Sequence, residues 1–98
     1  MSKTYLLQYT YGDGDRMVVL EEHKAYMREL VERRVNVVAG AYGPDETPGA
    51  VFVIRAGSPD EVAALSDADP FHSGGFVAER WITEFIPMSG ELVEQVKG

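Results

Sequence analysis

Cysteine is absent from this chain of 98 residues. That absence excludes disulfides, thiolate catalysis, iron–sulfur clusters and zinc sites built on cysteine. Histidine occurs only twice, which is too few for an all-histidine metal site within one chain. We therefore expect no intrinsic metal site.

Basic residues are scarce. Nine lysines and arginines face sixteen acidic residues, so the net charge is −7. Nucleic acids and anionic membrane surfaces both attract basic proteins, and neither is an expected partner. No apolar run approaches the ~20 residues that span a bilayer, and the amino terminus has no signal-peptide pattern. The sequence predicts a soluble, cytoplasmic protein with one domain over residues 1–98.

Strand-like and helical patterns alternate along the chain. The second helix has a clear start, with Ser58 as N-cap, Pro59 in the first turn and Glu61 completing a capping box. Pro70 disfavours helical geometry at the residue before it and ends this helix. Ser89 is a candidate cap for a short helix in the tail. The predicted strands cover residues 5–11, 35–42, 50–56 and 76–86, the first helix covers 17–34, and the tail covers 88–98.

The resulting order is β-α-β-β-α-β, which is typical of an α+β, ferredoxin-like sandwich. Such a fold has a four-stranded antiparallel sheet with both helices on one face. The strands are apolar on both alternating sides, as Val51 and Val53 against Phe52 and Ile54 illustrate. An apolar sheet face without helices predicts a partner, and a second copy is the simplest one. We therefore expect a homodimer through the sheet face.

His23 and Asp69 are the candidate acid–base residues. His23 shares the apolar stripe of the first helix with Leu20, Met27 and Leu30. It is either a hydrogen-bonded core imidazole or a general acid–base, for which an unperturbed pKa of about 6.5 is suitable. Asp69 is expected at the carbonyl end of the second helix, where a carboxylate is poorly placed. It is either a turn acceptor or the partner of a positive group.

Arg16, His72 and Ser73 are three further polar residues with a possible role at a site. Arg16, before the first helix, is either a solvated loop residue or a contact for an anionic ligand. His72 and Ser73 lie close to Asp69 in sequence, but no nucleophile motif accompanies them, so a catalytic triad is not predicted.

Three segments carry a resemblance to a known family. They are H-x-x-Y-M-x-x-L at His23–Leu30, A-G-A-Y-G-P at residues 39–44, and D-A-D-P-F-H-S-G-G-F at residues 67–76. With them the chain resembles the YciI-like (YCII-related) family over about residues 5–87. The resemblance implies a dimeric α+β barrel, in which two ferredoxin-like sheets pack face to face. It also implies a catalytic histidine–aspartate pair, which carries over to His23 and Asp69.

The function implied by the resemblance is that of a small, cofactor-free lyase or isomerase, related to dehydrochlorinases. His23 would transfer a proton on a small cyclic or aromatic compound bound in a cleft, and Asp69 would orient the imidazole. Arg16, Phe71 and Ser73 are the candidates for substrate contacts. Two alternatives stay open: a ligand-binding or accessory domain without catalysis, and a cofactor-free or haem-related monooxygenase of the same fold. If the pair acts together, its polar atoms should lie about 2.6–3.2 Å apart or share one water.

Overall fold

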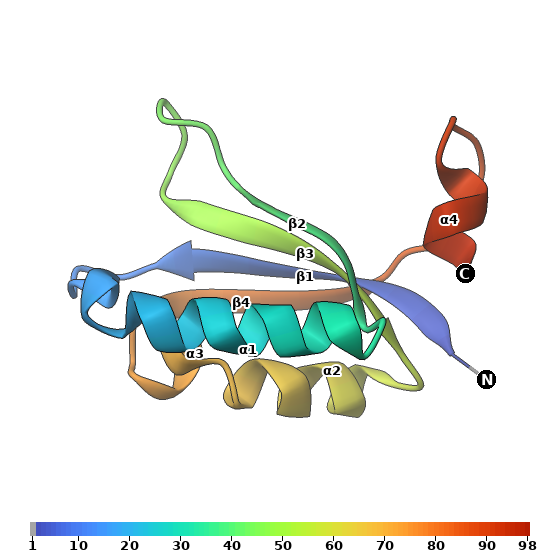
Figure 1. The fold of residues 1–98 in the computed structure, drawn as a ribbon. Helices are drawn as coiled ribbons and strands as arrows, with labels where there is room; N and C mark the ends of the chain where they lie inside the picture. Colours follow the sequence, from blue (N-terminus) through green and yellow to red (C-terminus); the bar gives the residue numbers. More distant parts are fainter. Residues whose placement is uncertain (1) are drawn as a thin grey trace.

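The computed structural model describes residues 2–98, and its helices lie mainly on one side of a sheet (Figure 1). The sheet is antiparallel with strand order β2-β3-β1-β4. Helices α1, α2 and α3 cover one face, while α4 rises on the other side (Figure 1). This is the ferredoxin-like α+β arrangement that the sequence predicted. The elements are β1 (Lys3–Tyr11), the 3₁₀ turn η1 (Arg16–Val19), α1 (Leu20–Glu32), β2 (Asn36–Ala41), β3 (Gly49–Ala56), α2 (Pro59–Asp67), α3 (Pro70–Ser73), β4 (Val77–Glu84) and α4 (Val93–Lys97).

The core lies between the sheet and the helices. Register places Tyr5, Leu7 and Tyr9 of β1 opposite Ile54, Phe52 and Ala50 of β3, and all six side chains are buried. The intervening side chains point to the other face, because successive residues of a strand alternate. Leu6, Val51 and Val53 are only half-buried there. In β1 and β3, one parity therefore builds the core, and the other lies on the outer face of the sheet.

The helix starts follow local capping chemistry, although three details differ from the sequence prediction: the first turn of the first helix, the closure of the capping box at α2 and the start of α4. The first helical segment opens as η1, where the Asp15 carboxylate accepts the backbone N–H of Met17 at 3.1 Å. At α2, the Ser58 hydroxyl accepts the N–H of Glu61 at 3.2 Å, as expected. The Glu61 carboxylate accepts from the N–H of Gly57, one residue before the cap, so the capping box closes one residue early. Ser89 makes no cap, because α4 begins after Leu92.

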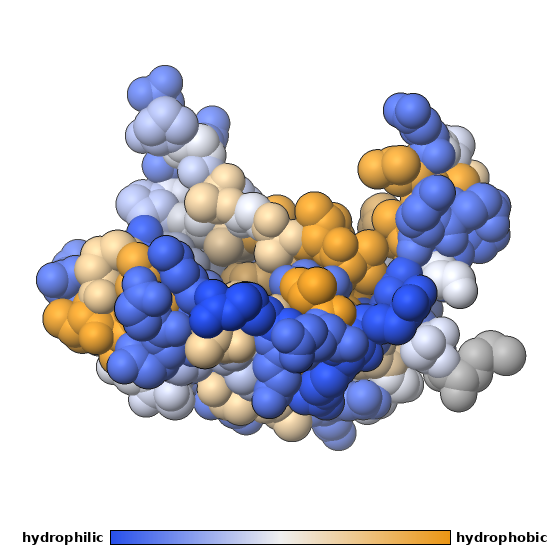
Figure 2. Space-filling model, viewed as in Figure 1, coloured by the Kyte–Doolittle hydropathy of each residue, from blue (hydrophilic) through white to orange (hydrophobic). Residues whose placement is uncertain are grey.

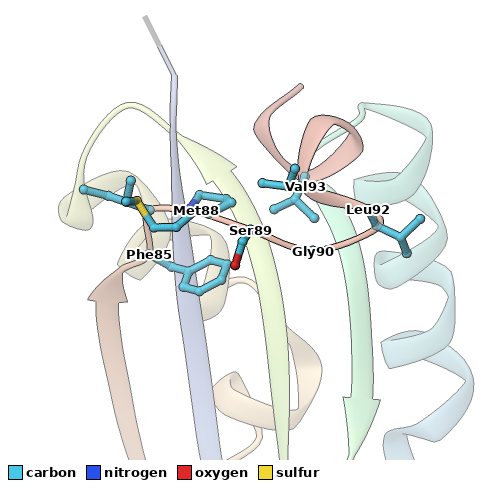
Figure 3. Close-up of a pocket in the computed structure, with 9 residues that line it drawn as sticks. Phe85, Met88, Ser89, Gly90, Leu92 and Val93 are labelled. Carbon is cyan, nitrogen blue, oxygen red and sulfur yellow. The ribbon is translucent and has the colours of Figure 1, made fainter.

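The chain after β4 crosses the outer face of the sheet and carries exposed apolar side chains (Figure 3). Phe85, Ile86, Met88 and Leu92 are 38–84 % exposed and line an open cavity of about 440 Å³. Arg55 of β3 holds this segment through a hydrogen bond to the carbonyl of Gln95. Figure 2 shows apolar side chains gathered in the hollow between the β2–β3 connection and the C-terminal segment. Over residues 2–98, no helix has the length and apolar character that crossing a membrane requires.

Candidate active site

His23 and Asp69 meet although 46 positions separate them. The His23 Nδ1 atom lies 2.7 Å from the Asp69 Oδ1 atom, within the range predicted for a direct hydrogen bond. Asp69 is 1 % exposed, and the side chain of His23 is 14 % exposed. The contact forms because α1 and the α2–α3 segment cover the same face of the sheet. One group is thus fully enclosed, while the other reaches a surface pocket.

Asp69 follows Ala68, the C-cap of α2, and its backbone N–H donates to the Ser66 carbonyl at 3.0 Å, but the expectation that a carboxylate is poorly placed there was wrong. Helix α2 ends at Asp67, and Asp69 is the N-cap of the short helix α3. Its Oδ1 atom accepts the backbone N–H of Phe71 at 3.0 Å, so a carboxylate is well suited to this position. The two interpretations of Asp69 therefore hold together: it is a turn acceptor and the partner of His23.

An aromatic wall positions the imidazole. The rings of His23 and Phe71 stack at 3.7 Å with an interplanar angle of 3°. Tyr11 meets Phe71 edge-on at 5.7 Å, and the Arg16 guanidinium lies 3.9 Å from the centre of the Tyr11 ring. A cation over an aromatic face is attracted by the ring quadrupole, so this packing gives Arg16 a defined place at the site.

His23 faces a pocket of about 380 Å³ between α1, η1 and the β2 edge of the sheet. Leu20, Met27, Phe52 and Phe71 are among its apolar lining residues, and Arg16 and Lys24 also lie on its lining. The described residues that line it include no carboxylate, although the chain is acidic overall. Within residues 2–98, no group of three or more histidine, aspartate or glutamate side chains is arranged to hold a metal ion. The pocket lining is thus mainly apolar, with two cationic side chains, Arg16 and Lys24.

Two of the residues named from the sequence lie outside this pocket. Ser73 is exposed and does not line it. His72 turns toward Asp67, with 3.7 Å between its Nδ1 atom and the Asp67 Oδ1 atom. Asp67 in turn accepts from Arg80 at 2.7 Å. These groups form a separate polar cluster on the surface.

Sequence reasoning missed Tyr9 and Ser66, which surround the other side of Asp69. The Tyr9 hydroxyl donates to the Asp69 Oδ2 atom at 3.0 Å and lies 2.8 Å from the Ser66 hydroxyl. Tyr9 is 0 % exposed and Ser66 is 2 % exposed. Strand parity offered a signal, because Tyr9 shares the core-facing side of β1 with Tyr5 and Leu7. A buried tyrosine hydroxyl needs a polar partner, and that requirement points to a polar group in the core.

Burial and charge keep these tyrosine hydroxyls protonated. Burial raises the pKa of Tyr9, and the nearby Asp69 carboxylate raises it further. Burial also raises the pKa of Tyr11, against the opposing effect of the Arg16 guanidinium. Tyr9 is therefore a hydrogen-bond donor to Asp69 throughout the neutral range.

Solved structures with the same fold cover most of this chain. One is a 5-chloro-2-hydroxyhydroquinone dehydrochlorinase from Burkholderia phenoliruptrix AC1100 in complex with 2,5-dihydroxybenzoquinone, with a TM-score of 0.65 at 22% identity, covering 84% of this chain and 92% of that one. A dimeric ferredoxin-like protein of unknown function from Bacteroides fragilis NCTC 9343 has a TM-score of 0.53 at 15% identity, with coverages of 86% and 94%. Another from Thermobifida fusca has a TM-score of 0.50 at 16% identity, with coverages of 87% and 90%. These likenesses show the fold.

The family follows from a match along the sequence itself. No curated protein matches the chain significantly. The YCII-related domain, however, matches residues 4–86, which reach from the second residue of β1 through the end of β4 and include both His23 and Asp69. The chain belongs to the YCII-related domain family.

Proposed function

We propose that this protein is a small acid–base enzyme of the lyase or isomerase type that acts on a small cyclic or aromatic compound. The observation that carries the proposal is the 2.7 Å contact between His23 and the buried Asp69, at the wall of an apolar pocket. A histidine oriented by a carboxylate is a typical general acid–base. The fold neighbour that is a dehydrochlorinase supports the reaction class.

The hydrogen bond to Asp69 assigns the tautomer of His23. A proton on Nδ1 serves the carboxylate, so the neutral ring keeps its free electron pair on Nε2. Nε2 would take a proton from an acidic C–H or O–H group of the substrate. The electron pair released then moves into the substrate. Either the proton returns at another carbon, which is an isomerisation, or a leaving group such as chloride departs, which is an elimination.

The proposed substrate carries negative charge on a flat ring. The cationic groups on the pocket lining, Arg16 and Lys24, favour a carboxylate or a phenolate over a cation. The apolar surfaces of Phe52 and Phe71 would cover the ring. A phenol or an aromatic acid meets both demands.

We further propose a homodimer through the outer face of the sheet. Val38 and Trp81 are 57 % and 46 % exposed, and Leu6, Val51 and Val53 extend the same apolar surface between them. Exposed apolar patches of this extent are typical of interfaces. Two neighbours of the same fold are described as dimeric, which supports this assembly.

The test is to measure proton transfer with and without the imidazole. The purified protein is incubated in D₂O with 2,5-dihydroxybenzoquinone, and loss of the ring C–H signal is followed by NMR; chloride release from 5-chloro-2-hydroxyhydroquinone is measured in parallel. His23→Gln should lower the rate about 10²–10⁴-fold, the usual contribution of general acid–base catalysis. His72→Gln is the matched control and should keep the wild-type rate.

Equal rates in the wild type and the His23→Gln variant would refute the proposal. Ligand binding without any exchange or elimination would instead favour a binding domain without catalysis. Binding is therefore followed separately, by the shifts of the His23 ring signals on addition of 2,5-dihydroxybenzoquinone.

A further inference from the structure

The proposed chemistry uses His23 and Asp69 and leaves the buried polar groups behind them without a role. Tyr9 from β1 and Ser66 from α2 are almost completely enclosed. Burying hydroxyl groups is unfavourable unless each is hydrogen-bonded. Here Tyr9 contacts both Ser66 and Asp69, so these groups form one continuous network with the carboxylate.

Counting protons fixes the direction of every hydrogen bond in this network. An ionised carboxylate only accepts. Its Oδ1 atom accepts from Nδ1 of His23 and from the N–H of Phe71, and its Oδ2 atom accepts from the Tyr9 hydroxyl. Tyr9 has a single hydroxyl proton, which it gives to Asp69, so its oxygen must accept from Ser66. The order is Ser66 to Tyr9 to Asp69, with His23 donating from the opposite side.

Tyr9 and His23 consequently compete for the charge of the same carboxylate. Each hydrogen bond that Asp69 accepts disperses some of its negative charge, and less remains to stabilise a protonated imidazole. The position of the hydroxyl is rigid, because the Tyr9 ring packs edge-on against Phe52 at 5.0 Å and against Tyr11 at 6.1 Å. The competition is therefore built into the folded core.

We propose that Tyr9, supported by Ser66, is a positioning residue that orients the Asp69 carboxylate and limits how strongly it holds a proton on His23. This inference rests on the proposed function, in which His23 must be unprotonated to act as a base. An unshielded carboxylate would stabilise the imidazolium, and more of the enzyme would be in the inactive, protonated form at neutral pH. The network keeps the base available without removing the group that orients it.

Other charges face the imidazole and must be held constant. Arg16 of η1 and Lys24 of α1 are cationic and line the same pocket. Tyr11 of β1 stays neutral beneath Arg16. On the far side of Asp69, Tyr26 donates to the carbonyl of Leu65 at 2.7 Å, and the His72 ring lies 6.5 Å from the Tyr9 ring. Substitution of Tyr9 by phenylalanine leaves all of these groups in place.

The experiment is an NMR titration of the two histidine rings in the full chain. The His72 signals are assigned with the His72→Gln variant, and the midpoint for His23 is measured in the wild type, Tyr9→Phe, Ser66→Ala and Asp69→Asn. Tyr9→Phe should raise the His23 midpoint by about half to one pH unit, and Ser66→Ala should raise it by less. Asp69→Asn should lower it. The acid limb of the pH–rate profile should move with each midpoint.

The His23 midpoint should rise in Tyr9→Phe and fall in Asp69→Asn, and this difference in direction separates the proposed role of Tyr9 from simple packing. If Tyr9 only filled space, its loss would leave the midpoint unchanged, or would lower it by weakening the contact between His23 and Asp69; either result overturns the inference. Should Tyr9→Phe fail to fold, Ser66→Ala decides by the same criterion. An upward shift in a protein with no proton-transfer activity would support the network and remove the proposed function. An unchanged His23 midpoint in Tyr9→Phe, together with a fall in Asp69→Asn, would remove the network and leave the proposed function standing.

Discussion

Removing the Asp69 carboxylate should destabilise the fold in a way that depends on what replaces it. Three buried or partly buried donors point at this side chain: the Tyr9 hydroxyl, the Phe71 N–H and Nδ1 of His23. An unsatisfied buried donor costs about 1–3 kcal/mol. His23 recovers part of its loss from water, since its side chain is 14 % exposed. Asp69→Ala should therefore lower the free energy of unfolding by about 3–6 kcal/mol, against about 5–15 kcal/mol for an ordinary domain.

Asparagine at the same position should cost much less. Its carbonyl oxygen still accepts from Phe71 and His23, and its amide donates to the Tyr9 oxygen once the tyrosine proton turns to Ser66. Every group then keeps a partner, and only the extra strength of bonds to a charged acceptor is lost, about 1–2 kcal/mol. The Asn and Ala variants should thus differ by about 1–5 kcal/mol, although both remove the charge.

Urea denaturation at pH 7, followed by far-ultraviolet circular dichroism, measures both values at one protein concentration. Asp67→Asn is the matched control, because Asp67 is 60 % exposed and pairs with Arg80 at the surface. A surface ion pair contributes about 0–1 kcal/mol, so this control should stay near the wild type. If the Asp69→Ala and Asp69→Asn variants unfold at the same urea concentration as the control, Asp69 does not hold the three donors and the reasoning fails.

Three other properties follow from the structure. Arg16→Gln should raise KM for a phenolate or carboxylate substrate about tenfold with little change in kcat, and equal effects on both would remove the anchoring role. Because the pKa values of Tyr9, Tyr11 and Tyr26 are raised, the folded state keeps protons that the unfolded chain releases above about pH 10. The free energy of unfolding should not change through this effect below that pH and should decrease above it. A free energy of unfolding that stays constant up to pH 11 would contradict this prediction. Trp81→Glu should shift light scattering from dimer to monomer; a 10.8 kDa mass for the wild type at micromolar concentration would refute the dimer itself.

The fold was predictable because hydrophobic periodicity and turn residues report on the whole core. Strand parity separated Phe52 and Ile54 from Val51 and Val53, and helical spacing placed His23 on the buried stripe of α1. The contact between His23 and Asp69 came from the family resemblance, since spacing alone left each residue with two interpretations. The start of α3 was missed because the proline that ends α2 also begins the next helix. Periodicity reports burial and gives no hydrogen-bond partners, so the network of Tyr9 and Ser66 stayed hidden.

The buried network has a consequence for how such a protein can change over time. The groups in contact with the proposed base or behind it, Tyr9, Ser66 and Asp69, are also core residues, so substitutions there lower the stability of the fold as well as any activity. The groups around the pocket mouth, such as Met17 and Lys24, are exposed and carry little of the fold. Selection on stability thus acts on the buried groups around Asp69, whatever the pocket binds. If the proposed function is right, this selection helps to retain the chemistry while the pocket mouth can change.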